Sequence, residues 1–188
     1  MRLPFGPQFQ WSFSPLGYYV GGISDRYAIH LFRTDAPVLR IEHASQPVSV
    51  SAGERRNERA LMIWSMRTVQ PGWDWDGPSI PDHKPAFSDL LVDRDGRIWV
   101  QLHVTGERLP ADQRVRDEDD VRRPVPEFYE PVVYDAFEPD GRFLGRLQMP
   151  DGFQSTPTPF IRGDRIWGVV TDELDIQYVV RLRIERGG

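Results

Sequence analysis

The chain of 188 residues contains no cysteine, and Lys84 and Asn57 are its single lysine and single asparagine. The missing cysteines exclude disulfide bonds, thiolate metal sites and a cysteine nucleophile. Its four histidines follow no metal-binding spacing, and no serine lies in a Gly-x-Ser-x-Gly motif. The sequence therefore predicts no metal ligand, no cofactor and no catalytic residue.

Long apolar runs and a basic stripe are also missing. No window is apolar enough to predict a membrane span, and the first residues lack the apolar segment of a signal peptide. The formal net charge is -5. Because phosphate binding needs clustered basic side chains, nucleic acid is not an expected partner.

A short pattern recurs along the chain. Residues 87–100 contain an apolar run, a tight polar turn and a second apolar run beginning Arg-Ile-Trp, and residues 160–170 repeat it with the same three letters. Residues 11–20 are a looser copy, with Tyr-Tyr in place of Ile-Trp. We expect Trp99, Trp167 and Tyr19 to occupy equivalent second strands, because such repeats are typical of β-propeller blades.

The sequence therefore predicts an all-β fold, a β-propeller-like arc of about three four-stranded antiparallel blades with one inserted α-helix. We expect a single partial propeller domain over 1–188, with units at about 9–43, 86–148 and 157–185. The glycines of Asp95-Gly96 and Asp140-Gly141 supply the positive φ that tight hairpin turns need.

Between the first two units the hydrophobic period changes to that of a helix. Ser51 and Glu54 match a capping box, which predicts a helical insertion at 51–70. We expect Ala60, Leu61 and Trp64 to form its apolar stripe. Residues 105–129 are strongly charged and predict a mobile surface excursion.

Residues 81–100, 134–145 and 163–183 resemble bacterial six-bladed β-propeller proteins of the NHL-like and TolB-like kind. The resemblance implies a protein that binds rather than transforms its ligand, in a family that is often exported. A six-bladed ring needs roughly twice this chain at about 40–45 residues per blade. The chain therefore resembles about the C-terminal half of such a propeller, either truncated or completed by assembly.

His83 and Lys84 precede the first strand of the second unit, with Asp82 and Asp89 nearby in the sequence. In a propeller this position adjoins the central channel, so the four residues are candidates for binding an anion or a carbonyl group. The alternative is that Lys84 pairs with a carboxylate and orders the loop.

Two further motifs have competing interpretations. Trp73 and Trp75 lie in a loop rich in aspartate and glycine, which could stack on a sugar or a peptide, or fold back over the inserted helix. The segment Asp93-Arg94-Asp95-Gly96 opens like a calcium loop but lacks the later ligands, which favours a simple turn.

The function we expect is that of a binding or interaction scaffold of propeller type, with a protein or small-molecule ligand. The alternatives are a metal-dependent hydrolase of lactonase type whose ligands come partly from outside this chain, and a truncated propeller without independent activity. An arc of three blades leaves an apolar face uncovered at each end, so we also expect self-association into a closed ring.

Overall fold

The computed structural model describes residues 3–114, 120, 122–174 and 176–185. The chain forms two compact units, which are described separately here. Unit 1 consists of Met1–Gly6, Pro47–Pro85 and Val104–Glu130. Unit 2 consists of Pro7–Gln46, Ala86–His103 and Pro131–Gly188. As predicted, the structure is mostly β, with four-stranded antiparallel sheets and one α-helix among the described residues.

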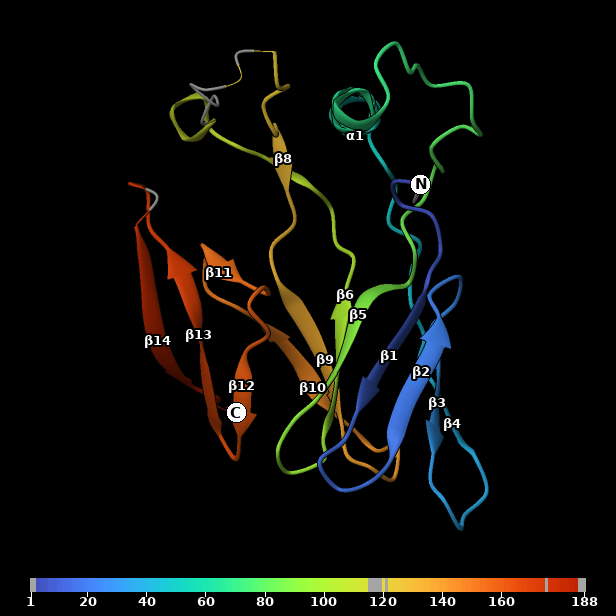
Figure 1. Cartoon of the computed structure of the whole chain (residues 1–188). Coiled ribbons are helices and arrows are strands. Elements are labelled where there is room, and N and C mark those ends of the chain that lie inside the picture. Colours follow the sequence, from blue (N-terminus) through green and yellow to red (C-terminus); the bar gives the residue numbers. More distant parts are fainter. Residues whose placement is uncertain (1–2, 115–119, 121, 175, 186–188) are drawn as a thin grey trace. The chain divides into compact units, whose positions relative to one another are not determined.

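The N-terminal sheet of unit 2 is a four-stranded antiparallel meander (Figure 1). Its strands, in spatial order, are β1 (Phe9–Phe13), β2 (Tyr19–Ile23), β3 (Ala28–Phe32) and β4 (Leu39–Glu42). Alternate residues of a strand point to opposite faces, and one face of this sheet is buried. Its buried side chains are Val20, Ile29, Leu31 and Ile41.

The middle sheet has the spatial order β10-β9-β6-β5. Its strands are β5 (Phe87–Val92), β6 (Ile98–Leu102), β9 (Val133–Phe137) and β10 (Phe143–Gln148). Gly96 and Gly141 have φ values of 85° and 91° in the two hairpin turns. The predicted Asp-Gly turns are thereby confirmed, because few residues other than glycine adopt this conformation.

The C-terminal sheet is centred on β13 (Arg165–Thr171). This strand pairs with β12 (Phe160–Arg162) and the short β11 (Phe153–Gln154), and also with β14 (Gln177–Arg183). The inner face of this sheet shares a core with the middle sheet. The buried members of that core are Trp99, Tyr134, Ala136, Met149, Phe153, Ile161 and Ile166.

The repeated sequence pattern corresponds to three hairpins in unit 2. Trp99, Trp167 and Tyr19 lie on β6, β13 and β2, each the second strand of its hairpin, as predicted. Their burial differs, since Trp99 is only 3% exposed whereas Tyr19 is 37% exposed. The pattern therefore predicts the strand position of each aromatic residue but not its degree of burial.

Unit 1 is built around α1 (Ala52–Val69), and both hydrogen bonds of the predicted capping box are present. The residues of the predicted apolar stripe, Ala60, Leu61 and Trp64, are half-buried, whereas Arg56 and Arg59 of the predicted polar side are exposed. The one fully buried residue of this helix is Glu54. Among the described residues, no helix has the length and the apolar composition that a membrane span requires.

The 105–129 excursion contributes regular structure to unit 1. It contains β7 (Glu107–Arg108), the 3₁₀ turn η1 (Ala111–Gln113) and β8 (Phe128–Tyr129), and β7 pairs with β8. The Asn57 side chain donates to the Val125 carbonyl and accepts from the Glu127 amide, at 2.9 Å in both cases. One side chain of the helix thereby holds the backbone of this segment by two hydrogen bonds. The charged stretch 115–119 lies outside the described residues.

Candidate binding surface

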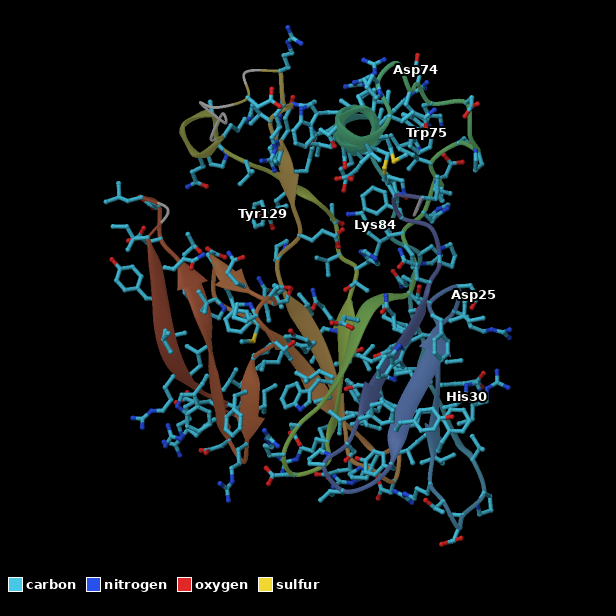
Figure 2. The ribbon with its side chains drawn as sticks, in the orientation of Figure 1. Asp25, His30, Asp74, Trp75, Lys84 and Tyr129 are labelled. Carbon is cyan, nitrogen blue, oxygen red and sulfur yellow. The ribbon has the colours of Figure 1, made fainter. Side chains whose placement is uncertain are left out.

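The ammonium group of Lys84 is buried in unit 1 between two carboxylates (Figure 2). Its Nζ lies 2.6 Å from Glu54 Oε1 and 3.1 Å from Glu130 Oε1, and it donates to the Val104 carbonyl at 2.8 Å. The ring of Phe5 lies 5.2 Å from the same nitrogen. All three ammonium hydrogens therefore have an acceptor within the protein. This arrangement matches the alternative in which Lys84 pairs with a carboxylate.

The carboxylate of Glu54 joins the helix cap to this ion cluster. Burial alone would raise the pKa of Glu54, but hydrogen bonds from Lys84 and Ser51 outweigh it and lower that pKa. Glu58 is the neighbouring acid on α1. Burial, reinforced by the charges of Glu130 and Glu54, raises the pKa of Glu58. Unit 1 thus contains a compact group of one cation and several carboxylates with opposite pKa shifts.

The neighbours of Lys84 in the sequence have other partners. The Asp82 carboxylate forms an ion pair with Arg55 at 2.6 Å, and its side chain is largely exposed. His83 forms a β-bridge with Ser49 and is exposed. Asp89 belongs to unit 2, where it accepts a hydrogen bond from the Leu90 amide, and burial raises its pKa. The structure therefore does not describe the four predicted residues as one site.

Trp73 and Trp75 are fastened to the inserted helix by arginines. The Arg67 guanidinium donates to the Trp73 carbonyl at 2.7 Å, and Arg59 Cζ lies 6.0 Å from the centre of a Trp75 ring (Figure 2). The Trp75 indole donates to the Pro78 carbonyl at 3.1 Å. These contacts match the interpretation in which the loop folds back over the helix.

The Asp93 carboxylate is engaged by its own hairpin. One oxygen accepts from the amides of Asp95 and Arg97, and the other accepts from the Trp99 indole at 2.9 Å. These bonds are those of a turn-closing aspartate and match the turn interpretation. The described residues contain no group of three or more histidines or acids placed to hold a metal ion.

The outer face of the N-terminal sheet carries an exposed set of aromatic rings. The sequence leads us to expect an uncovered apolar face at each end of the predicted arc, but it does not identify the residues that form it. On β1, Phe9, Trp11 and Phe13 are 60%, 54% and 68% exposed. The residues between them point inward, and Ser12 Oγ accepts a hydrogen bond from the Val92 amide of β5. This strand is therefore inverted, with its polar side toward the protein and its aromatic side toward solvent.

The rings of this aromatic face form a continuous row across three strands. Phe13 lies opposite Tyr19 and Tyr19 opposite Phe32, and the Tyr19 and Phe32 rings stack 4.4 Å apart. Trp11 and Phe13 meet edge to face at 5.1 Å. His30, labelled in Figure 2, extends the row at 6.2 Å from Phe32.

The aromatic face has little net charge. Arg40 and Glu42 are the only Arg, Lys, Asp or Glu residues in β1–β4, and they form an ion pair with each other. A hollow of about 340 Å³ opens beside the row, lined by residues that include Phe13, Tyr19 and Phe32. Monomeric proteins rarely leave a contiguous apolar patch of this kind open to water.

The three aromatic residues of β1 were visible in the sequence as a strict alternation with Gln10 and Ser12. Alternation predicts which side chains share a face, and the usual expectation is that the apolar face is the buried one. Here that expectation is wrong. The signal that could have revealed the inversion is long-range, namely the pairing of Ser12 with β5.

Comparison with known proteins gives one weak structural similarity. No protein-family model and no curated protein matches the chain. A crystal structure described as a member of the DUF4221 family from Bacteroides vulgatus resembles it with a TM-score of 0.48 and 9% sequence identity. The match covers 94% of this chain and 45% of that one, so the chain spans less than half of the matched protein's length.

Proposed function

We propose that this protein is a binding scaffold and that the aromatic face of the N-terminal sheet is its recognition surface. The observation that carries the proposal is the inversion of β1, which exposes Phe9, Trp11 and Phe13 while Ser12 points inward. Exposing large aromatic rings opposes the hydrophobic effect. A fold that nevertheless presents such a row gains free energy when a partner covers it.

We also propose that the three sheets of unit 2 are blades of a β-propeller arc, related to about half of a six-bladed NHL-like or TolB-like protein. Support comes from the repeated hairpin pattern and from the packing of the middle sheet against the C-terminal sheet. On the other side of the middle sheet, Tyr27 contacts Phe87 and Phe137. Its hydroxyl also donates to the buried Asp135 carboxylate at 2.9 Å.

The ring geometry favours a protein partner over a carbohydrate. A sugar chain stacks on rings that lie in one plane, but Trp11 and Phe13 are inclined at 75° and Phe13 and Tyr19 at 61°. Such an uneven surface suits interdigitating side chains of another protein surface. The neighbouring hollow, which Phe13 and Tyr19 help to line, accepts a protruding side chain in the same way.

A double variant tests this function with the dye ANS as the probe. Trp11→Ser with Phe13→Ser removes two exposed rings. Because these rings make few contacts, we expect the free energy of unfolding to fall by only about 1–3 kcal/mol. At protein concentrations near 100 nM, native wild-type protein should enhance ANS fluorescence, and the double variant should lose most of that enhancement.

The matched control is Ile29→Ala, which acts on the buried face of the same sheet. It should reduce the free energy of unfolding by about 2–5 kcal/mol and leave native-state ANS fluorescence unchanged. Unchanged ANS fluorescence in the double variant would overturn the proposed function. The proposed function would also be overturned if the double variant lost more free energy of unfolding than Ile29→Ala does, because the two rings would then stabilise the fold.

A further inference from the structure

The outer face of the C-terminal sheet also exposes apolar side chains, among them Phe160 and Val179, and its chemistry differs from that of the aromatic face. In one row Phe160 lies opposite Trp167, which lies opposite Arg181. In the next, Arg162 lies opposite Arg165, which lies opposite Arg183. Directly opposed residues point to the same side of a sheet. On this arginine face, the Phe160 and Trp167 rings are therefore bordered by Arg181 at one end of their row and by a row of three arginines on one side.

The positive charge of the arginine face is only partly neutralised. The strands β12, β13 and β14 contain no acidic residue. Asp164 in the intervening turn pairs with Arg165 at 3.3 Å and with Arg183 at 3.2 Å. Within the described part of the chain, no ion pair involves Arg162 or Arg181. Two guanidinium groups are thus available to a partner.

Aromatic and arginine faces are complementary. A guanidinium group over an aromatic ring gains electrostatic attraction, and the gain increases when water is excluded. The chain already uses this pairing internally, since Arg94 Cζ lies 5.4 Å from the Phe160 ring and Arg33 Cζ lies 5.6 Å from the Tyr18 ring.

We propose that the partner of the aromatic face is the arginine face of a second copy of this chain, in a reciprocal two-fold pair. This inference rests on the proposed function, because it names the occupant of the same surface. In the pair, Arg162 and Arg181 of each copy lie over the Trp11, Phe13 and Tyr19 rings of the other.

The area of contact favours a closed pair over an open chain of copies. Four strands about 4.8 Å apart, each five residues long with a rise of about 3.4 Å, cover about 300 Å². One aromatic-to-arginine contact therefore buries about 600 Å² in total, which is below the range of about 1,200–2,000 Å² for stable interfaces. A reciprocal pair makes this contact twice and reaches about 1,200 Å².

Sedimentation equilibrium of the purified chain tests the pair. We expect the mass to rise from 21.8 kDa to twice that value with increasing concentration and then to stay constant. Arg162→Glu with Arg181→Glu should raise the dissociation constant by about tenfold or more, because it replaces cations with anions over aromatic rings. The control Arg56→Glu with Arg122→Glu makes the same charge change in unit 1 and should leave the constant unchanged.

A second pair of variants probes the aromatic side and keeps the test valid if the arginine variants fold poorly. Trp11→Glu places an anion opposite the arginine face, whereas Trp11→Arg places a cation there. We expect Trp11→Arg to weaken the pair at least tenfold more than Trp11→Glu. Equal effects of the two variants, or a mass that keeps growing with concentration, would overturn the reciprocal pair.

The two proposals fail differently in these experiments. A wild-type chain that stays monomeric while binding ANS through Trp11 and Phe13 overturns the second copy as partner and leaves the proposed function standing. If the wild type and the Trp11→Ser, Phe13→Ser double variant enhance ANS fluorescence equally, the proposed function itself is overturned.

Discussion

At the scale of single residues, Lys84 shows how a buried charge can belong to the framework of the protein. Its side chain is fully buried and the Glu54 side chain is 4% exposed. Removing two such ions from water is costly, and the cost is offset only when partners saturate both groups. Glu54 also closes the cap of α1, so the ion pair connects the helix start to the segment that contains Lys84.

Replacement of this lysine should therefore be severe. We predict that Lys84→Met lowers the free energy of unfolding by about 3–5 kcal/mol, because it leaves Glu54 buried without a cation. Arg55→Met breaks the largely exposed pair with Asp82 and should cost about 0–1 kcal/mol. Urea unfolding of both variants measures the difference, and equal small losses would contradict a structural role for Lys84.

Lys84→Met should also reverse the effect of Glu54 on how the free energy of unfolding depends on pH. In the wild type the pKa of Glu54 is lowered from its ordinary value of 4.5, so its stabilising effect is present above that pH and is lost as the pH falls. Without Lys84, burial raises that pKa. The difference in free energy of unfolding between wild type and Lys84→Met should then shrink as the pH falls from 7 toward 4.5. A difference that stays constant over this range would contradict the ion pair.

At the scale of elements, the first turn of α1 is closed by a complete capping box. The Glu54 amide donates to Ser51 Oγ at 3.1 Å, and the Ser51 amide donates to the Glu54 carboxylate at 2.8 Å. The helix has no buried apolar residue. Local hydrogen bonds therefore account for a large part of the specificity of its first turn.

We predict that Ser51→Ala reduces the free energy of unfolding by about 0.5–2 kcal/mol. Ser65→Ala makes the same chemical change at an exposed interior position of the helix. It should be neutral or slightly stabilising, since alanine is the better helix former. Chemical denaturation of the two variants provides the comparison, and equal effects would mean that the cap does not define the helix start.

The elements themselves could largely be predicted from the sequence. The alternation in 28–32, the Asp-Gly turns and the capping box each depend on residues close together in the chain. Pairing of Lys84 with a carboxylate was one interpretation of the sequence, but its partners Glu54 and Glu130 could not be identified, because they are distant in sequence and meet Lys84 only through folding. The inverted β1 was missed for the same reason.

At the scale of the whole molecule, the described residues of unit 2 expose two chemically different faces, one on the N-terminal sheet and one on the C-terminal sheet. The N-terminal sheet presents Trp11 and Phe13 with little charge, and the C-terminal sheet presents Phe160 and Trp167 among arginines. Two faces of one kind would favour random association. Complementary faces define both the partner and its orientation.

The most direct test of the central claim is hydroxyl-radical footprinting of the tryptophans, resolved by mass spectrometry. In dilute protein Trp11, which is 54% exposed, should be oxidised at least tenfold faster than Trp99, which is 3% exposed and serves as the internal control. At concentrations where the chain pairs, the oxidation rate of Trp11 should fall several-fold while that of Trp99 stays constant. A slow Trp11 rate in the dilute monomer would contradict the account, because the aromatic face would then be closed to any partner.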